Sequence, residues 1–203
     1  MMGPIYAITD ADSPRAVAEQ ALGAARGGAW AVQLRDKRAS DADLVAQARA
    51  LQILLRPLGV KLIINDRLEV ARAVDADGLH IGQGDIAPEE ARGHLGAGKL
   101  LGLSIEARAQ CAAIPPCVDY IGVGPVRATA TKPDHAPPLG MDGLAAIISQ
   151  SRVPAFAIGG IGPGDASALK AAGALGMAVV SAISRAPDAE AATRALSEEW
   201  RQA

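Results

Sequence analysis

A long polar stretch in the second half of the chain carries side chains that could bind an anion. It reads GVGPVRATATKPDHAPPLG and contains Arg127, Thr129, Thr131 and Lys132. Hydroxyl donors next to cationic side chains suit phosphate above all other anions. A loop of this length inside a compact domain is usually functional or disordered. A solvated surface loop would explain the stretch equally well, so the rest of the chain has to decide.

Two aspartates follow neighbouring strand-like runs and could share a cation. Asp66 comes just after the apolar run at 62–64, and Asp85 follows the run at 78–81 in a glycine-rich turn. Magnesium is typically held by one or two carboxylates together with substrate phosphates and waters. Each aspartate also has a purely structural interpretation. Asp66 could cap a helix together with Glu69, and Asp85 could be an ordinary turn residue.

A cationic set could complement such a metal. Arg35 and Lys37 are two residues apart in an extended segment, so their side chains point the same way. Together with Lys132 and magnesium they could hold a diphosphate. The alternative is a solvated cluster of charges on the surface.

Two further segments, Gly159-Gly160-Ile161 and Val180-Ser181-Ala182, favour a second phosphate site. Each follows a strand-like run and precedes a helix-like run. Backbone N–H groups at such positions form the phosphate cradle of many barrels, and glycine lets the backbone approach the phosphate closely. A tight turn at the glycine pair is the alternative.

Short β-like runs alternate with helix-like runs along the whole chain. The strands are expected at residues 5–9, 29–34, 62–64, 78–81, 100–103, 118–123, 155–158 and 177–180. The helices are expected at about 17–25, 44–55 (capped by Ser40 or Asp41), 68–74, 88–95, 106–114, 142–148, 163–172 and 187–200.

Eight such units predict one (β/α)8 barrel domain over residues 1–203. A doubly wound open sheet is the competing architecture, but it would concentrate its polar groups at one switch point. Here polar groups follow nearly every strand, and in a barrel they would share one face. They are Gln33, Arg35, Lys37, Asn65, Asp66, Asp85, Ser104, Thr129, Thr131, Lys132, Gly160 and Ser181.

The composition of the chain limits the kind of core and the partners that can be expected. Half of the residues are hydrophobic but only 2% are aromatic, which predicts a core of Ala, Val, Leu and Ile. A net charge of −2 argues against a nucleic-acid partner. The first residues do not resemble a signal peptide and no apolar run could span a bilayer, so we expect a cytoplasmic protein without a membrane partner. Cys111 and Cys117 are expected to be reduced, structural residues.

No nucleophile set is apparent, and His80, inside a strand pattern, is expected to be a hydrogen-bonded core histidine. Chemistry here should therefore rest on electrostatics and positioning.

The ordered set of strand-end motifs resembles thiamine-phosphate synthase. The motifs are QLRDK at 33–37, NDR at 65–67, HIGQGD at 80–85, TATK at 129–132, IGGI at 158–161 and VSAI at 180–183. Each motif alone is weak, but the resemblance covers essentially the whole chain in order.

The resemblance implies a transferase that joins 4-amino-2-methyl-5-hydroxymethylpyrimidine diphosphate to 4-methyl-5-(2-hydroxyethyl)thiazole phosphate and releases diphosphate. It implies that the C–O bond breaks first and that the thiazole nitrogen captures the resulting cation. It also implies Mg²⁺ on Asp66 and Asp85, catalytic roles for Arg35, Lys37, Ser104 and Lys132, and a homodimer. The implied contacts of the pyrimidine diphosphate are Gln33, Leu34, Arg35, Asp36, Lys37, Asn65, Ser104 and Lys132. Those of the thiazole phosphate are Thr129, Ala130, Thr131, Gly160, Val180 and Ser181.

The chain departs from the family pattern at Arg127-Ala128, where Phe-Pro is common, and Arg127 could add a phosphate contact. A related thiazole tautomerase is the nearest alternative, but its loop carries a histidine where Pro125 stands here. Sugar-phosphate epimerases or isomerases need an acid/base pair that is not evident at these strand ends. A non-catalytic phosphate-binding barrel is the remaining alternative.

Overall fold

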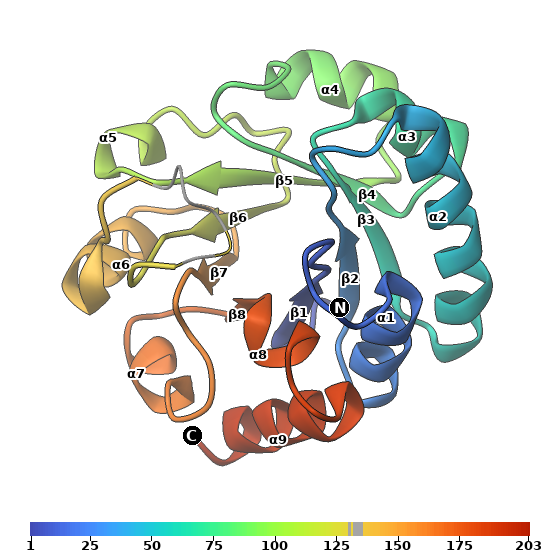
Figure 1. Cartoon of the computed structure of the whole chain (residues 1–203). Helices are drawn as coiled ribbons and strands as arrows, with labels where there is room; N and C mark the ends of the chain where they lie inside the picture. Colours follow the sequence, from blue (N-terminus) through green and yellow to red (C-terminus); the bar gives the residue numbers. More distant parts are fainter. Residues whose placement is uncertain (130, 132–135) are drawn as a thin grey trace.

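Eight parallel strands close into a barrel in this computed structural model, which describes residues 1–129, 131 and 136–203 (Figure 1). Each strand pairs with the next, and β8 returns to β1 with Ile5 opposite Met177. The strands are β1 (Ile5–Ile8), β2 (Ala31–Leu34), β3 (Lys61–Asn65), β4 (Gly78–Ile81), β5 (Leu100–Ile105), β6 (Tyr120–Val123), β7 (Ala155–Ile158) and β8 (Gly176–Val179). The predicted (β/α)8 fold is confirmed.

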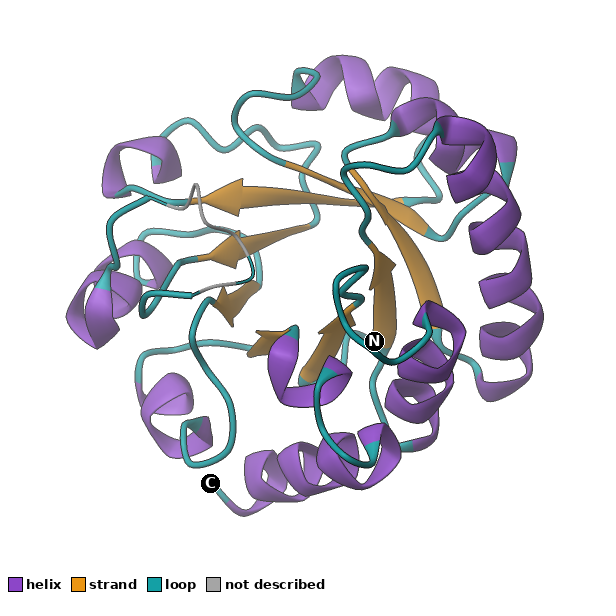
Figure 2. Cartoon of the chain, viewed as in Figure 1, coloured by secondary structure: helices purple, strands orange, loops and turns teal. Residues whose placement is uncertain are grey.

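The helices form a ring around the strands (Figures 1 and 2). They are α1 (Val17–Arg26), α2 (Asp41–Leu55), the 3-10 turn η1 (Arg56–Leu58), α3 (Leu68–Ala73), α4 (Pro88–Leu95), α5 (Arg108–Cys111), α6 (Gly140–Ile148), α7 (Ala166–Ala171), α8 (Ser181–Ser184) and α9 (Ala189–Gln202). The predicted cap of α2 is confirmed, because Ser40 Oγ accepts from the Asp43 backbone N–H at 3.2 Å. Within the described part of the chain, no helix is long and apolar enough to cross a membrane.

The core has two layers with different chemistry. Aliphatic side chains such as Val32, Leu62 and Ile64 fill the space between strands and helices, as the composition predicted. The barrel interior differs, because Tyr6, Tyr120 and Phe156 are buried there and pack edge to face with centroids 5.6–5.8 Å apart. Trp30 joins them, so all the aromatic residues except Trp200 gather in this one cluster. The predicted core of Ala, Val, Leu and Ile is confirmed between the strands and helices, and the barrel interior adds an aromatic cluster that the composition did not indicate.

Several element boundaries differ from the predicted ones for local reasons. The helix predicted at 106–114 is only Arg108–Cys111, because proline at 115 and 116 disfavours helix just before it. The helix predicted to start at Asp142 starts at Gly140, with no side-chain cap. The short helix α8 was not predicted, since its four residues carry no periodic pattern.

Both cysteines are free thiols, and Cys111 is buried.

Candidate active site

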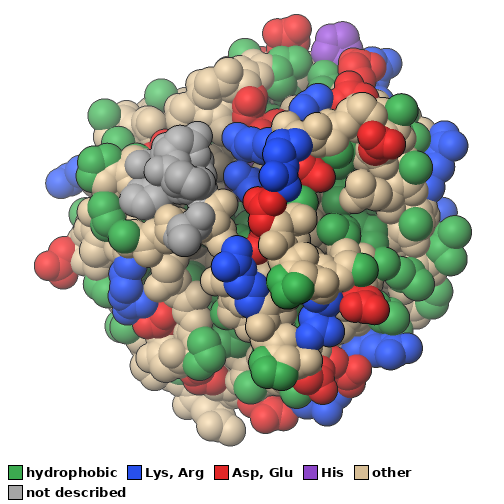
Figure 3. Space-filling model, viewed as in Figure 1, with side chains coloured by type: hydrophobic (Ala, Val, Ile, Leu, Met, Phe, Trp, Pro, Cys, Tyr) green, Lys and Arg blue, Asp and Glu red, His purple; other side chains and the backbone are tan. Residues whose placement is uncertain are grey.

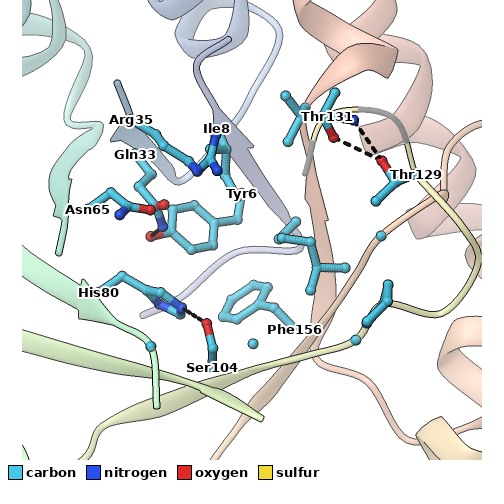
Figure 4. A pocket seen from close by; sticks show the side chains of 18 of the residues that line it. Tyr6, Ile8, Gln33, Arg35, Asn65, His80, Ser104, Thr129, Thr131 and Phe156 are labelled. Carbon is cyan, nitrogen blue, oxygen red and sulfur yellow. Dashed lines mark hydrogen bonds between the residues drawn. The ribbon is translucent and has the colours of Figure 1, made fainter. Parts of the chain in front are cut away.

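A cavity of about 370 Å³ opens where the strands end, a size that suits a small-molecule ligand. Most of the predicted site residues line it: Gln33, Arg35, Lys37, Asn65, Asp66, Asp85, Ser104, Thr129, Thr131, Gly160, Val180 and Ser181. In the view of Figure 4, Thr129 and Thr131 lie across the pocket from Gln33 and Asn65. Figure 3 shows basic side chains gathered beside acidic ones near the centre of this face.

Of the other predicted site residues, two do not line the cavity and two lie outside the part of the chain that the structure describes. The Leu34 side chain is buried in the layer between strands and helices, and Asp36 Oδ1 accepts from the backbone N–H groups of Arg38 and Ala39. Neither residue is among those that line the cavity. Ala130 and Lys132 lie outside the described residues.

An acidic pair lies at one side of the cavity. Burial raises the pKa of the Asp66 carboxyl, and the neighbouring Asp85 carboxylate raises it further, while Lys37 opposes both effects. The Lys37 ammonium lies 3.6 Å from Asp66 Oδ2. Since two carboxylates this close repel each other, a bound cation would stabilise the pair.

Local backbone structure positions the two carboxylates. Asp66 has a positive φ of 59°, an uncommon conformation for a residue other than glycine, although aspartate tolerates it better than most. Helix α3 starts after Arg67 and has no side-chain cap, so the helix-cap interpretation of Asp66 is wrong. Asp85 does close its turn, because its Oδ2 accepts from the Gly82 N–H at 2.7 Å. The turn orients Asp85 and leaves Oδ1 outside that hydrogen bond.

The donor set of the acidic pair fits magnesium better than zinc. No group of three or more His, Cys, Asp or Glu side chains suited to a metal occurs among the described residues. Two carboxylates are nevertheless enough for Mg²⁺ when phosphate oxygens and waters supply the other ligands. The acidic pair therefore fits a metal that arrives with a phosphorylated ligand.

The opposite side of the cavity offers hydroxyls and backbone amides. Thr129 Oγ1 and Thr131 Oγ1 lie 2.9 Å apart. Gly160 has a φ of +63°, and a Cβ there would lie 2.8 Å from Ala128 O, so the chain needs glycine at this point. Val180 and Ser181 lead into α8 beside it. This arrangement suits a single phosphate group.

Arg127 is not available as a free cation at this side. Its guanidinium pairs with both carboxylate oxygens of Asp165, at 2.8 and 2.9 Å, and also donates to Gly160 O at 3.1 Å. The Arg127 guanidinium holds the pKa of the Asp165 carboxyl below its ordinary value. The expectation that Arg127 contacts phosphate is therefore not supported. Asp165, which is distant in sequence, supplies the carboxylate partner of Arg127. The pair connects the polar stretch to the turn before α7.

Buried polar side chains form the floor of the cavity, and of Tyr6, Tyr120 and His80 only His80 was predicted from the sequence. Tyr6 and Phe156 line the cavity, and Tyr120 lies beneath it. His80 is buried and hydrogen-bonded, as predicted, but it also lines the cavity, 3.0 Å from Ser104 Oγ (Figure 4). Burial lowers the pKa of His80 to about 4 and raises those of Tyr6 and Tyr120. The available signal was the presence of tyrosines inside strands of a chain with very few aromatic residues.

Comparison with known proteins agrees with this geometry. A family model described as thiamine monophosphate synthase matches residues 5–183. A thiamine-phosphate synthase of Xanthobacter autotrophicus is 49% identical over 198 residues, covering 95% of this chain and 92% of the relative. One from Roseiflexus sp. is 45% identical over 197 residues, covering 96% and 84%.

The chain belongs to the thiamine monophosphate synthase family.

A solved structure supports the same family assignment. Thiamine phosphate pyrophosphorylase from Pyrococcus furiosus superposes with a TM-score of 0.89 at 30% identity, covering 98% of this chain and 96% of the other. Family membership confirms the resemblance that the strand-end motifs indicated. The chain is therefore a transferase of thiamine biosynthesis, and its family acts on small-molecule substrates.

Proposed function

We propose that this chain is a thiamine-phosphate synthase that joins the aminopyrimidine diphosphate to the thiazole phosphate. The observation that supports the proposal is one cavity with two chemically different sides. The acidic pair with Arg35 and Lys37 forms one side, and Thr129, Thr131 and Gly160 form the other. Two differently built anion sides suit a reaction between two phosphorylated substrates.

The first side would hold the diphosphate. Asp66 and Asp85 would hold Mg²⁺, which when bound neutralises charge on the departing diphosphate. Arg35 has its backbone N–H fixed by Thr9 Oγ1 at 3.0 Å, and its side chain reaches the cavity beside Gln33 (Figure 4). Arg35, Lys37 and Lys132 would bind the diphosphate oxygens where negative charge develops.

The reaction itself exchanges one bond for another. The electron pair of the pyrimidinylmethyl C–O bond leaves with the diphosphate, and the thiazole nitrogen donates its lone pair to form the new C–N bond. No proton has to be removed by a side chain in this exchange. Arg35, Lys37, Asn65 and Ser104 would orient the pyrimidine diphosphate so that the thiazole nitrogen approaches its methylene carbon.

The second side would hold the thiazole phosphate. Hydroxyls of Thr129, Thr131 and Ser181 and backbone N–H groups at Gly160 and Val180 would bind its oxygens. Water would have to be excluded from this side, because it would otherwise capture the cation.

The proposal extends to assembly and location. We expect a homodimer, because two-fold pairs are the commonest oligomers and the family resemblance implies one, and we expect it in the cytoplasm.

The test supplies both substrates with Mg²⁺ and follows thiamine phosphate by chromatography. Formation of product that requires both substrates supports the synthase. Conversion of a thiazole isomer without any pyrimidine diphosphate would indicate the tautomerase instead. Tight binding of both ligands without turnover would indicate a non-catalytic barrel.

A further inference from the structure

The segment that follows β1 lies beside α8, although 171 residues separate Ser13 from Ser184 in sequence (Figure 1). Ser13 Oγ donates to Ser184 O at 2.8 Å. The Arg15 guanidinium donates to Ala186 O and to Pro187 O, both at 2.7 Å. These carbonyl groups belong to the last residue of α8 and to residues just after it. The segment after β1 therefore caps the C-terminal end of α8.

Helix α8 is too short to be stable by itself. It has four residues, Ser181–Ser184, and its N-cap Val180 makes no side-chain capping hydrogen bond. A single helical turn fixes several backbone dihedrals for very few hydrogen bonds, and the carbonyl groups at its C-terminal end have no partner inside the helix. Groups outside the helix must hold the turn, and a cation such as Arg15 is favourable at that end.

An ion pair adds to this cap. Arg185 directly follows α8, and its Nε and Nη2 atoms both donate to Asp10 Oδ2 at 3.2 Å. The Asp10 side chain is only 9% exposed. A carboxylate this buried is costly without a cationic partner, so the pair favours one position of Arg185 relative to β1.

The segment itself is fixed by a side chain of α1. Gln20 is buried, and its Oε1 accepts from the Asp10 N–H at 2.9 Å. Its Nε2 donates to Asp10 O at 2.9 Å and to Arg15 O at 2.7 Å. One buried amide therefore binds both ends of the segment and gives Ser13 and Arg15 a defined position from which they hold α8.

The opposite end of α8 reaches the cavity, where Val180 and Ser181 belong to the lining together with Gly160. We propose that Ser13 and Arg15 are positioning residues for the phosphate of the thiazole substrate. They hold α8 so that Val180 and Ser181 stay in place for that phosphate. Neither Ser13 nor Arg15 lines the cavity, so both act through α8. The inference rests on the proposed function for the identity of the phosphate.

Arg15→Ala tests the inference by steady-state kinetics with each substrate varied in turn. We expect the KM for the thiazole phosphate to rise roughly three- to tenfold, and the KM for the pyrimidine diphosphate to stay within about twofold of the wild type. Arg15→Lys keeps a cationic donor for the carbonyl groups and should restore part of the lost affinity. A purely structural role would lower the melting temperature and leave the ratio of the two KM values unchanged.

Two further variants complete the set. Ser13→Ala removes a single hydroxyl group, so it should fold, and it should raise the same KM by a smaller factor than Arg15→Ala does. Arg26→Ala is the matched control, because Arg26 is exposed at the other end of α1. The Arg26→Ala variant should keep both KM values of the wild type.

The outcomes separate this inference from the proposed function. A folded Arg15→Ala that keeps the wild-type KM for the thiazole phosphate, or that raises both KM values equally, overturns the inference. The proposed function then stands, because the wild type still forms thiamine phosphate. If Arg15→Ala does not fold, the same comparison on Ser13→Ala decides. A wild type that forms no thiamine phosphate overturns the proposed function and the inference with it.

Discussion

The ammonium of Lys37 lies 3.6 Å from Oδ2 of Asp66, beside a second carboxylate from Asp85. These three side chains come from the ends of β2 and β3 and from the turn after β4, so the barrel alone brings them together. Lys37 lowers the pKa of Asp66, but burial and Asp85 raise it by more, so the carboxylate pair is not fully compensated. The arrangement therefore has capacity for one more cation, which the proposed reaction would use.

Replacing Asp66 tests that capacity. Asp66→Asn should lower kcat about 100-fold or more, because the charge that binds the metal diphosphate is lost. Asparagine tolerates the positive φ, so the fold should survive. Steady-state kinetics with varied Mg²⁺ measure the effect.

Asp75→Asn is the matched control for Asp66→Asn. Asp75 is the other non-glycine residue with positive φ in the described part of the chain, and it pairs with Lys99 away from the cavity. The Asp75→Asn variant should leave kcat unchanged. Equal rates in Asp66→Asn and the wild type would contradict the metal assignment.

We expect Arg127 to position the loop that carries Thr129 and Thr131 rather than to contact substrate. Arg127→Ala removes the bonds to Asp165 and to Gly160 O, and this should loosen the phosphate side. We expect the KM for the thiazole phosphate to rise roughly three- to tenfold, with little change in the KM for the pyrimidine diphosphate. Arg72→Ala, which breaks an exposed pair with Glu69, is the control. If KM rises equally for both substrates, the assignment of the two sides is wrong.

His80 should make stability depend on pH. Its pKa is about 4 in the folded protein against 6.5 ordinarily, so below pH 6.5 the unfolded chain binds the proton more readily. Stability from neutral His80 is complete above pH 6.5 and is lost as pH falls towards 4, by roughly 3 kcal/mol. Urea unfolding at several pH values measures it.

The comparison for this pH effect is His80→Gln, which should show a shallower loss of stability over the same range. His94→Gln should behave as the wild type, because His94 is exposed. Parallel pH curves for the wild type and His80→Gln would refute a depressed pKa at this position.

Gly102 has no Cβ, and the side chains of Tyr120 and His80 occupy the space where one would lie. Gly102→Ala would force Tyr120 and His80 apart and should cost about 1–3 kcal/mol of stability. Thermal melts measure the loss. Gly98→Ala places its Cβ in open space and should melt close to the wild type.

The sequence predicted the barrel well because each strand carries its own signal. Gly78–Ile81 and Ala155–Ile158 have the predicted bounds, since apolar runs there end at glycine or polar residues. Weak or short elements were harder to predict. The α5 segment has helical residues, but nearby prolines shorten it, and α8 is a single turn whose start follows from the strand before it.

A position in the cavity lining was predictable where one motif supplies one side chain, as for Asp66, Asp85 and Lys37. It was not predictable where the role depends on a distant partner. Nothing near Arg127 in sequence indicates Asp165, and nothing near Tyr6 indicates Tyr120, 114 residues away. Such pairings arise only when the closed barrel brings separate strands together.

The most direct test of the proposed reaction is the balance between its two products. Purified protein with both substrates and Mg²⁺ should form thiamine phosphate and diphosphate in equal amounts, and omitting either substrate or chelating the metal should abolish thiamine phosphate. Diphosphate release without thiamine phosphate, or no turnover by a folded protein that binds both substrates, would contradict it.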